Sequence, residues 1–394
     1  MGRTRRHVYY RPPRANPALI PVHEPALGPS ERAALLRCVE AGDAGGHSPT
    51  VHAFEEAFAA RVGSQHALAA ASGTAALHLA FAALGIGAGD EVIVPSFTFA
   101  PCADMVNLVG ATPVLVDVDP VSFDLTPQAV LDALTPRSRA VLAVHMYGHP
   151  CDLGALAEVC RANDLLLVED CAQGLGALHA QRPVGSVGAA SCYSFYANKV
   201  ITTGEGGMVT TDDADLAGRL RWLQRHAQVP DPDHAYVHTA VGFNDRMSAF
   251  AAAVGIAQLR RLDEFLERKA ANTSRYTEAL DAVPGIRPPA PVREGDRHAN
   301  WAYGVLVDPE VVAGGAQGIA GALRASGVET RGFYHPLHLH PGAAGRSRFA
   351  APLAACEAFA PNGLVLPSGS TLTAGEVDQV TATVARHVAR LVTS

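Results

Sequence analysis

From about residue 55 onward, segments with two different spacings of hydrophobic residues follow one another along the chain. Stretches with apolar residues three or four positions apart predict helices, and short unbroken apolar runs predict strands. Because the two kinds of segment take turns, the pattern predicts an α/β fold, with a mostly parallel sheet and helices on both faces. We expect helices at residues 51–61, 74–84, 100–109, 128–134, 153–162 and 214–227, and strands at residues 91–95, 113–117, 140–145 and 165–170.

The four predicted strands are apolar throughout, which is typical of strands buried on both faces. In sheets of this kind a ligand lies beyond the carboxyl ends of the strands. The candidate functional residues are therefore those that end or follow a strand: Ser72, residues 95–99, His145, Asp170 and Ser194.

A change of composition marks a second region. Residues 248–280 have a helical pattern, and residues 283–292 form a proline-rich connector. Beyond it we expect a strand at 301–307 and helices at 315–326 and 373–391. The chain then divides into a disordered tail at residues 1–17, a large doubly wound domain at 18–262 and a smaller C-terminal α/β domain at 263–394.

Composition narrows the class of protein. With 394 residues, the chain is long enough for two domains with their own cores. A net charge of −7 argues against a nucleic-acid partner, and no apolar run is long enough for a membrane helix. The seven cysteines lack the paired spacing of a zinc site, so we expect no metal. They are typical of a reduced compartment, and we expect a cytoplasmic protein without a membrane partner.

The chain has only two lysines, Lys199 and Lys269. Lys199 follows an aromatic strand and precedes a glycine cluster, which suits an oriented, partly desolvated amine that attacks a carbonyl. Lys269 lies in a polar helical stretch and is interpreted as an ordinary solvated side chain. Scarcity alone would favour codon bias as the explanation, so the context of Lys199 has to decide.

Other strand-end residues supply that context. Ser72, Gly73 and Thr74 lie where a strand gives way to a helix, and their N–H and hydroxyl groups suit a phosphate at the positive end of the helix dipole. Phe99 follows the next strand and could stack on a ring. Taken singly, most turns of this kind bind nothing, and an aromatic residue is more often part of the core.

Asp170 closes the most apolar strand, where a buried carboxylate needs a cationic partner. A protonated pyridine nitrogen would supply one, although Asp170 could equally cap the turn at Ala172 or Gln173. Gln173 could donate to a ring oxygen, and Ser194 could reach the phosphate. An anion cradle, a stacking ring, an acid and an amine in this order fit one cofactor, pyridoxal 5'-phosphate.

The chain resembles the DegT/DnrJ/EryC1/StrS family of fold-type I aminotransferases over nearly its whole length, and within it the perosamine synthase group, which aminates GDP-4-keto-6-deoxymannose. The resemblance rests on residues 20–25, 195–208, 242–248 and 328–338. It implies that Lys199 attaches the cofactor, that Asp170 pairs with the pyridine nitrogen and that Phe99 stacks on the ring. It also implies that Gly73, Thr74 and Ser194 hold the phosphate.

The resemblance further implies a homodimer with shared sites, in which Asn244 reaches the phosphate of the neighbouring subunit. We expect an amino-acid donor, L-glutamate or L-glutamine, and a nucleotide-linked keto-deoxysugar as acceptor, in amino-sugar, antibiotic or polysaccharide biosynthesis. Candidate substrate contacts are His145, Arg331, His335 and His338, with a structural role for at least one of these histidines equally plausible.

Three departures from the perosamine synthase pattern weaken the substrate assignment. The first two are Asp245 and the segment 43–47. The third is Gln173, because related enzymes have histidine or glutamate at that one position. A keto-cyclitol aminotransferase and a non-catalytic cofactor-binding sensor remain alternatives. A nucleotide diphosphate would favour a basic mouth to the site, whereas a cyclitol would not. Lys199 itself disfavours the family's sugar dehydratases, which carry histidine there.

Overall fold

The computed structural model describes residues 16, 18–229 and 236–392. The eight strands of its main sheet run in the order β1-β9-β8-β5-β4-β2-β3-β13. Neighbouring strands from β8 to β13 are parallel, and β9 is antiparallel to both of its neighbours. The strands span His66–Ala70 (β1), Gly207–Thr211 (β9), Ala190–Ser194 (β8), Leu166–Asp170 (β5), Ser138–Val144 (β4), Glu91–Pro95 (β2), Thr112–Val116 (β3) and Arg348–Phe349 (β13).

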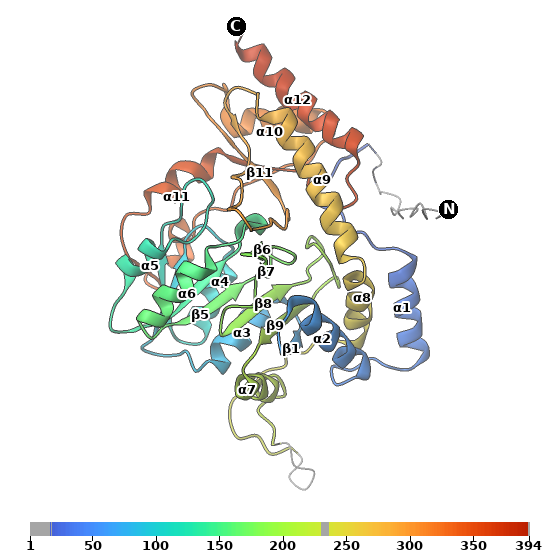
Figure 1. The fold of residues 1–394 in the computed structure, drawn as a ribbon, viewed down its shortest axis with the longest axis vertical. Coiled ribbons are helices and arrows are strands. Elements are labelled where there is room, and N and C mark those ends of the chain that lie inside the picture. The colour runs from blue at the N-terminus through green and yellow to red at the C-terminus, as the bar shows by residue number, and fades with distance from the viewer. Residues whose placement is uncertain (1–15, 17, 230–235, 393–394) are drawn as a thin grey trace.

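Helices cover both faces of this sheet (Figure 1), as the alternating pattern predicts. Successive residues of β5 point to opposite faces, so that Leu167 joins one apolar cluster and Val168 the other. The first cluster contains residues of Pro49–Val62 (α2), Pro127–Ala133 (α5), Leu153–Ala162 (α6) and Ala249–Leu259 (α8). The second contains residues of Gly73–Ala83 (α3), Pro101–Leu108 (α4) and Ala214–Gln224 (α7).

A second, four-stranded antiparallel sheet lies in the C-terminal region, in the order β10-β11-β14-β12. Its strands are Ile286–Arg287 (β10), Tyr303–Val307 (β11), Gly363–Leu366 (β14) and Arg331–Gly332 (β12). Helices Leu262–Leu280 (α9), Gly315–Ala325 (α10) and Ala374–Val392 (α12) share an apolar cluster with it. Among the described residues, the remaining elements are Pro29–Glu40 (α1), Ala354–Phe359 (α11), Leu178–His179 (β6), Arg182–Pro183 (β7) and the 3₁₀ turns Met146–Gly148 (η1), Leu337–Leu339 (η3), Pro341–Ala343 (η4) and Ala360–Asn362 (η5).

Two features differ from the sequence expectations. The helical stretch 248–280 is two helices, α8 and α9, with a turn fixed by Arg261, whose guanidinium bonds the Glu31 carboxylate and the Ala26 carbonyl oxygen. Strand β13 belongs to the C-terminal region yet pairs with β3 of the main sheet. The division at residue 262 therefore stays a prediction, and all but residue 16 of the tail at 1–17 lies outside the described residues.

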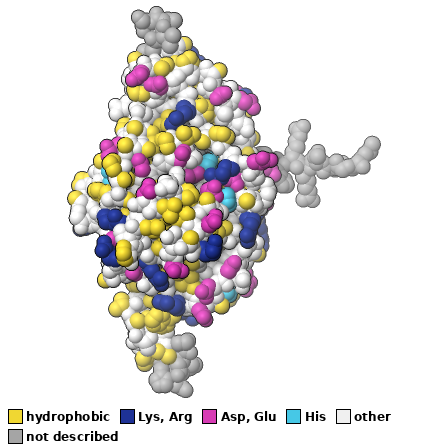
Figure 2. All heavy atoms as spheres, turned by 60° about the vertical axis from the view of Figure 1, so that its left-hand side comes forward, with side chains coloured by type: hydrophobic (Ala, Val, Ile, Leu, Met, Phe, Trp, Pro, Cys, Tyr) yellow, Lys and Arg dark blue, Asp and Glu magenta, His cyan; other side chains and the backbone are white. Residues whose placement is uncertain are grey.

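The surface carries mixed charge. Figure 2 shows one face on which basic and acidic side chains are interspersed among hydrophobic ones. Within the part of the chain that the structure describes, no helix combines the length and the hydrophobicity needed to cross a membrane.

Candidate active site

Lys199 lies in the loop between β8 and β9, at the carboxyl end of β8. Its Nζ atom is 4.5 Å from the ring centroid of Trp301. The surrounding protein removes water from this amine and lowers its pKa to about 8, although the charge of Asp170 acts in the opposite direction. A lysine amine is a nucleophile or a base only when neutral, so this environment makes Lys199 reactive close to neutral pH.

Asp170 ends β5, and its side chain is buried. Oδ1 accepts a hydrogen bond from the Ala172 backbone N–H at 2.8 Å, and Oδ2 accepts one from the Cys102 thiol at 3.1 Å. Burial raises the pKa of that thiol well above its usual value, so the thiol stays protonated and donates. The turn-capping role is therefore real, but it leaves lone pairs on both oxygens of a carboxylate that is held in a fixed orientation.

The start of α3 lies against the end of β8. Ser72 is the N-cap of α3. A Cβ atom added to Gly73 would lie 2.7 Å from Ser194 Cβ, and one added to Gly207 would lie 2.3 Å from the Ser72 carbonyl oxygen. Only glycine allows these two segments of the backbone to approach so closely. The N–H groups of Gly73 and Thr74 have no acceptor within the helix and carry its positive dipole end, so this cradle suits a phosphate.

Phe99 exposes 57% of its surface, and its ring centroid is 5.9 Å from that of Tyr334. Burial raises the pKa of Tyr334 to about 12, and the Asp170 carboxylate acts in the same direction. The exposed Phe99 ring is thus available for stacking beside Asp170.

Gln173 is buried, and its Oε1 accepts a hydrogen bond from the Tyr147 backbone N–H at 2.7 Å. This bond fixes the orientation of the amide and leaves its nitrogen, which is the donor, for the ring oxygen of a cofactor.

His145 does not face the site. Its side chain is fully buried, Nε2 lies 3.1 Å from Glu169 Oε2, and Nδ1 accepts the Cys151 backbone N–H at 3.2 Å. The expected substrate contact is corrected accordingly: His145 belongs to the core, where the Glu169 carboxylate also accepts three backbone N–H groups, from Gly185, Val187 and Gly188.

The two candidate histidines of the C-terminal region, His335 and His338, differ. His338 is engaged at both ring nitrogens, with Nδ1 at 2.7 Å from Ser96 Oγ and Nε2 at 3.1 Å from Glu357 Oε1. This is the structural role that the sequence left open. His335 is exposed, and its ring centroid is 5.1 Å from that of His340.

Arg331 is exposed on β12. Burial lowers the pKa of His23 well below its usual value, and the charges of Lys269, Arg331 and Lys199 lower it further, in that order. The effect indicates that Arg331 and Lys199 lie on the same side of the molecule, with His23 within reach of both charges.

Lys269 is buried, with only 3% of its surface exposed. Its Nζ donates to the carbonyl oxygens of Asn300, Trp301 and Ser368 at 3.3, 3.1 and 2.5 Å. The prediction of an ordinary solvated lysine is wrong. The missed signal was spacing, since Lys269 follows Phe265 by four positions and precedes Tyr276 by seven, on the buried stripe of α9.

Asn244 is exposed and accepts a hydrogen bond from Arg246 Nε at 3.0 Å. Arg246 also contacts two histidine nitrogens, His47 Nε2 at 3.0 Å and His226 Nε2 at 3.3 Å. We call Arg246, His47, His226 and the nearby Arg225 the Arg246 cluster. It includes part of the segment 43–47 that departs from perosamine synthases. A second departure, Asp245, has Oδ2 at 3.5 Å from His78 Nδ1.

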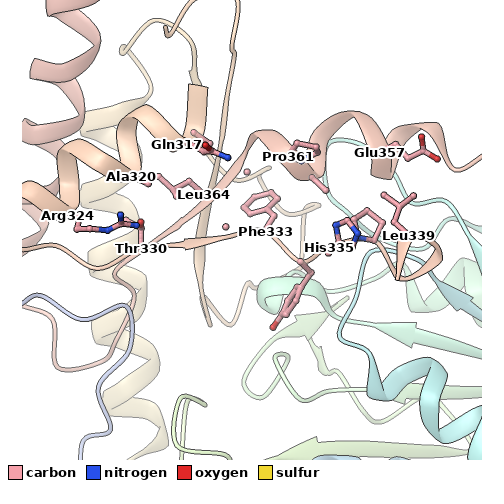
Figure 3. A pocket seen from close by; sticks show the side chains of 16 residues that line it. Gln317, Ala320, Arg324, Thr330, Phe333, His335, Leu339, Glu357, Pro361 and Leu364 are labelled. Carbon is pink, nitrogen blue, oxygen red and sulfur yellow. The ribbon is translucent and has the colours of Figure 1, made fainter. Parts of the chain in front are cut away.

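The C-terminal region contains a cavity of about 380 Å³. Figure 3 shows the side chains that line it. Arg324 lies toward one end of it, Glu357 toward the other, and Phe333 between them. Neither Lys199 nor Asp170 lines this cavity, but Tyr334, whose ring lies 5.9 Å from that of Phe99, does.

Comparison with known proteins identifies the family. Residues 26–385 match the DegT/DnrJ/EryC1/StrS aminotransferase family. The chain belongs to this family. It is 41% identical to GDP-perosamine synthase of Caulobacter vibrioides over 364 residues, which are 92% of this chain and 96% of that protein.

Solved structures agree with the assignment. The aminotransferase TlmJ from Streptoalloteichus hindustanus superposes with a TM-score of 0.88 at 34% identity, over 95% of this chain and 100% of that one. DesI, solved in the presence of its TDP-sugar product, gives a TM-score of 0.86 at 33% identity, over 96% of this chain and 95% of that one. The resemblance, the fold type and the class of enzyme, a pyridoxal phosphate-dependent aminotransferase of the DegT/DnrJ/EryC1/StrS family, are confirmed.

The strand-end residues fit pyridoxal 5'-phosphate, the cofactor of this aminotransferase family. The glycine-lined cradle suits its phosphate, the buried Asp170 carboxylate suits its ring nitrogen, and Lys199 offers a desolvated amine. The exposed ring of Phe99 suits its pyridine ring.

Three further residues near the site escaped sequence reasoning: Trp301, Cys102 and Tyr334. Trp301 and Tyr334 come from the C-terminal region, more than 100 positions from Lys199, and no local pattern links them to it. Cys102 offered a weak signal, since it lies in the first turn of α4, three positions after Phe99. Only the tertiary fold brings these side chains together.

Proposed function

We propose that this protein transfers an amino group from an amino acid, L-glutamate or L-glutamine, to the keto group of a nucleotide-linked keto-deoxysugar. The observation that carries the proposal is the desolvated amine of Lys199, which stands at the same sheet edge as the buried Asp170 carboxylate. Similarity to GDP-perosamine synthase over nearly the full length of both chains supports the class of acceptor.

Lys199 performs the proton transfers. Its neutral Nζ would remove the proton from the α carbon of the donor and, as an ammonium, deliver it to the C4' carbon of the bound cofactor. With the acceptor the same two proton transfers would run in reverse. A pKa near 8 suits both duties, because the amine takes and releases protons without a large cost in either direction. Trp301, 4.5 Å from Nζ, helps to exclude water from this exchange.

Asp170 and the cradle hold the cofactor. When bound, pyridoxal phosphate supplies an electron sink for the bond that loses its proton. Asp170 keeps a proton on the ring nitrogen, and the hydrogen bonds from Ala172 and Cys102 keep its carboxylate in place. Ser72, Gly73, Thr74 and Ser194 bind the phosphate, Phe99 stacks on the ring, and Gln173 donates to the ring oxygen.

The Arg246 cluster favours a nucleotide diphosphate over a keto-cyclitol. Arg246 is bonded to one amide oxygen and two histidine nitrogens, none of which is negatively charged. Burial, with the charges of Arg225 and Arg246 next, lowers the pKa of His47, so the histidine stays neutral. The guanidinium charge is therefore not compensated within the cluster and can attract an anion.

A homodimer would bring this cluster to an active site. A groove of about 920 Å³ between α1 and α8 is lined by Leu35, Leu36 and Phe250, which expose between 36% and 50% of their surfaces. The loop residues Gly204 and Glu205, which follow Lys199, line the same groove. Continuity between an exposed apolar groove and the Lys199 loop supports a second copy of the chain as its occupant, with Asn244 at the neighbouring phosphate.

Complementation tests the shared site. Asn244→Ala and Lys199→Ala proteins should each be impaired as pure species. A mixture of the two variants, unfolded and refolded together, should regain about one working site in each mixed dimer. One of its two sites then combines an intact Lys199 from one subunit with an intact Asn244 from the other. No recovery would argue against a site shared between subunits.

A screen of donors and acceptors tests the reaction itself. The protein loaded with pyridoxal phosphate should change colour when L-glutamate or L-glutamine is added, and GDP- or TDP-linked 4-keto-6-deoxysugars should reverse the change. A keto-cyclitol that reverses it while nucleotide-linked sugars do not would establish the alternative acceptor. If none of the donors changes the colour, the protein binds the cofactor without turnover.

The cysteines bear on the proposed cytoplasmic location. All seven are free, and all are buried. This state supports a reducing compartment such as the cytoplasm.

A further inference from the structure

The second lysine of the chain carries an unexpected set of contacts. An ammonium group has three N–H donors, and Lys269 Nζ has three backbone carbonyl acceptors, on Asn300, Trp301 and Ser368. A neutral amine has only two donors, so this arrangement is complete only for the protonated form. Burial lowers the pKa of Lys269 to about 7, but three carbonyl acceptors on one nitrogen fix its position.

The three acceptors lie on two segments of the C-terminal region. Asn300 and Trp301 precede β11, and Ser368 follows β14, the strand that pairs with β11. Asn300 has φ of 52°, in the left-handed region that residues other than glycine rarely adopt. Such a conformation persists only where surrounding contacts hold it, and the hydrogen bond from Lys269 is one of them.

The side chain of Trp301 reaches Lys199. Its indole Nε1 donates to the carbonyl oxygen of Asn198 at 2.9 Å, and its ring lies 4.5 Å from Lys199 Nζ. The His23 ring stacks on the same indole, with centroids 5.2 Å apart and an angle of 19° between the planes. Trp301 is thus a wall of the space around the reactive amine, and its backbone is held by Lys269.

We propose that Lys269 is a positioning residue, whose three hydrogen bonds fix the backbone of Trp301 and thereby keep the indole ring over the amino group of Lys199. The inference rests on the proposed function only in taking Lys199 as the reactive amine. Lys269 itself touches neither substrate nor cofactor in this role. Its removal should loosen the indole and let water reach Lys199.

Tryptophan fluorescence tests the geometric part. The chain has two tryptophans, so Trp222→Phe leaves Trp301 as the sole emitter in the full-length protein. In this background Lys269→Met should raise the rate of acrylamide quenching about threefold or more, because the ring is no longer held against its neighbours. Unchanged quenching in a folded Lys269→Met protein would overturn the proposal.

Asn272→Ala is the matched control. Asn272 lies on the same helix, and its side chain donates to the Leu372 carbonyl oxygen of the same C-terminal region at 3.2 Å. Its loss removes a similar tie between α9 and this region without touching Trp301, so quenching should not change. An equal rise in both variants would show that general loosening, and not the contact with Trp301, is responsible.

A titration of Lys199 tests the functional part. Protein labelled with ¹³C at lysine Cε, free of cofactor, should give two lysine signals, which Lys199→Ala and Lys269→Met assign. In Lys269→Met the titration midpoint of Lys199 should move upward by about one pH unit or more, because hydration favours the charged form. A midpoint that stays in place would contradict the proposal, whatever the activity of the enzyme.

A double-mutant cycle separates positioning from other effects. If Lys269 acts through Trp301, then Trp301→Ala and the double variant Trp301→Ala/Lys269→Met should share one Lys199 midpoint. Additive shifts would show a different route and overturn the proposal. Should Lys269→Met fail to fold, Lys269→Gln, which keeps two donors for the carbonyls, should shift quenching and titration in the same directions by less. No shift in a folded Lys269→Gln protein would also overturn it.

Discussion

Lys199 and Lys269 are both surrounded by protein, yet their nitrogens are held in opposite ways. Burial lowers both pKa values, to about 8 for Lys199 and about 7 for Lys269, so desolvation does not distinguish them. Hydrogen bonds do. Lys269 donates to three carbonyl oxygens, whereas no hydrogen-bond acceptor of Lys199 Nζ is found in the described part of the chain. A desolvated lysine that is surrounded by hydrogen-bond acceptors, such as Lys269, therefore holds the structure together. A desolvated lysine beside an aromatic ring and a charge, such as Lys199, is a reactive amine.

The most severe test of this difference is Lys199→Ala. Removing the amine removes both the covalent attachment point and the base, so transamination should fall by about a thousandfold or more. Borohydride treatment of the wild-type protein with pyridoxal phosphate should leave a label on Lys199 alone, and the variant should carry none. A label on Lys269 would contradict the comparison, and Asn272→Ala should retain wild-type labelling.

Asp170→Asn should have the next largest effect. The amide keeps the size of the side chain but loses the charge that pairs with the ring nitrogen, so the rate should fall about a hundredfold while cofactor is still bound. Stopped-flow absorbance after mixing with L-glutamate measures the rate, and equilibrium dialysis measures binding. A rate near that of the wild type would refute the pairing role of Asp170.

The pH dependence of cofactor capture sharpens the comparison further. Only the neutral amine attacks the aldehyde, and for a group with a pKa near 8 the neutral fraction grows as pH rises. The capture rate of the cofactor-free protein should therefore rise about tenfold per pH unit below pH 8 and level off above it. A rise that continues to pH 10 would show that Lys199 behaves like a solvated lysine.

Gly73→Ala addresses the cradle and should have the smallest of these effects. The new Cβ would lie 2.7 Å from Ser194 Cβ, so one of the two phosphate-binding segments has to move. Cofactor affinity should fall about fivefold to tenfold, because a shift of this kind breaks at least one hydrogen bond to the phosphate. Fluorescence titration with pyridoxal phosphate measures it.

Gly218→Ala is the control for that substitution. Gly218 lies in the middle of α7, and a Cβ there meets nothing within 4 Å. It should leave cofactor affinity unchanged and raise helix stability by up to about 1 kcal/mol. Equal loss of affinity in both variants would mean that the contact with Ser194 is not the cause.

Sequence reasoning located the part of the site that lies at strand ends. The buried strand β5 is visible as an unbroken apolar run, and parallel strands place their final residues at one edge, so Asp170 and Ser194 could be named. Lys199 stood out because it follows a strand and precedes a glycine turn. These are local patterns, which is why they were sufficient.

The rest of the site depends on contacts between distant segments. Trp301 reaches Lys199 only because the fold brings the segment before β11 to the loop after β8, where the indole donates to the Asn198 carbonyl oxygen. Nothing near residue 301 in the sequence indicates a role. The position of His145 at a strand end suggested an active-site residue, but its ring turns into the core toward Glu169. The polar neighbours of Lys269 suggested an exposed helix face, although the spacing of Phe265 and Tyr276 places it on the buried one.

Strand β13 has a consequence for how this molecule can be divided. Two residues from the C-terminal third, Arg348 and Phe349, cover the outer edge of β3. A fragment ending at residue 262 would leave that edge unpaired and open to association with other chains. It would also lose the helix that carries Lys269 and the segment that carries Trp301. Residues 1–262 are therefore expected to fold into a stable, unassociated protein only when the last third of the chain is synthesised with them.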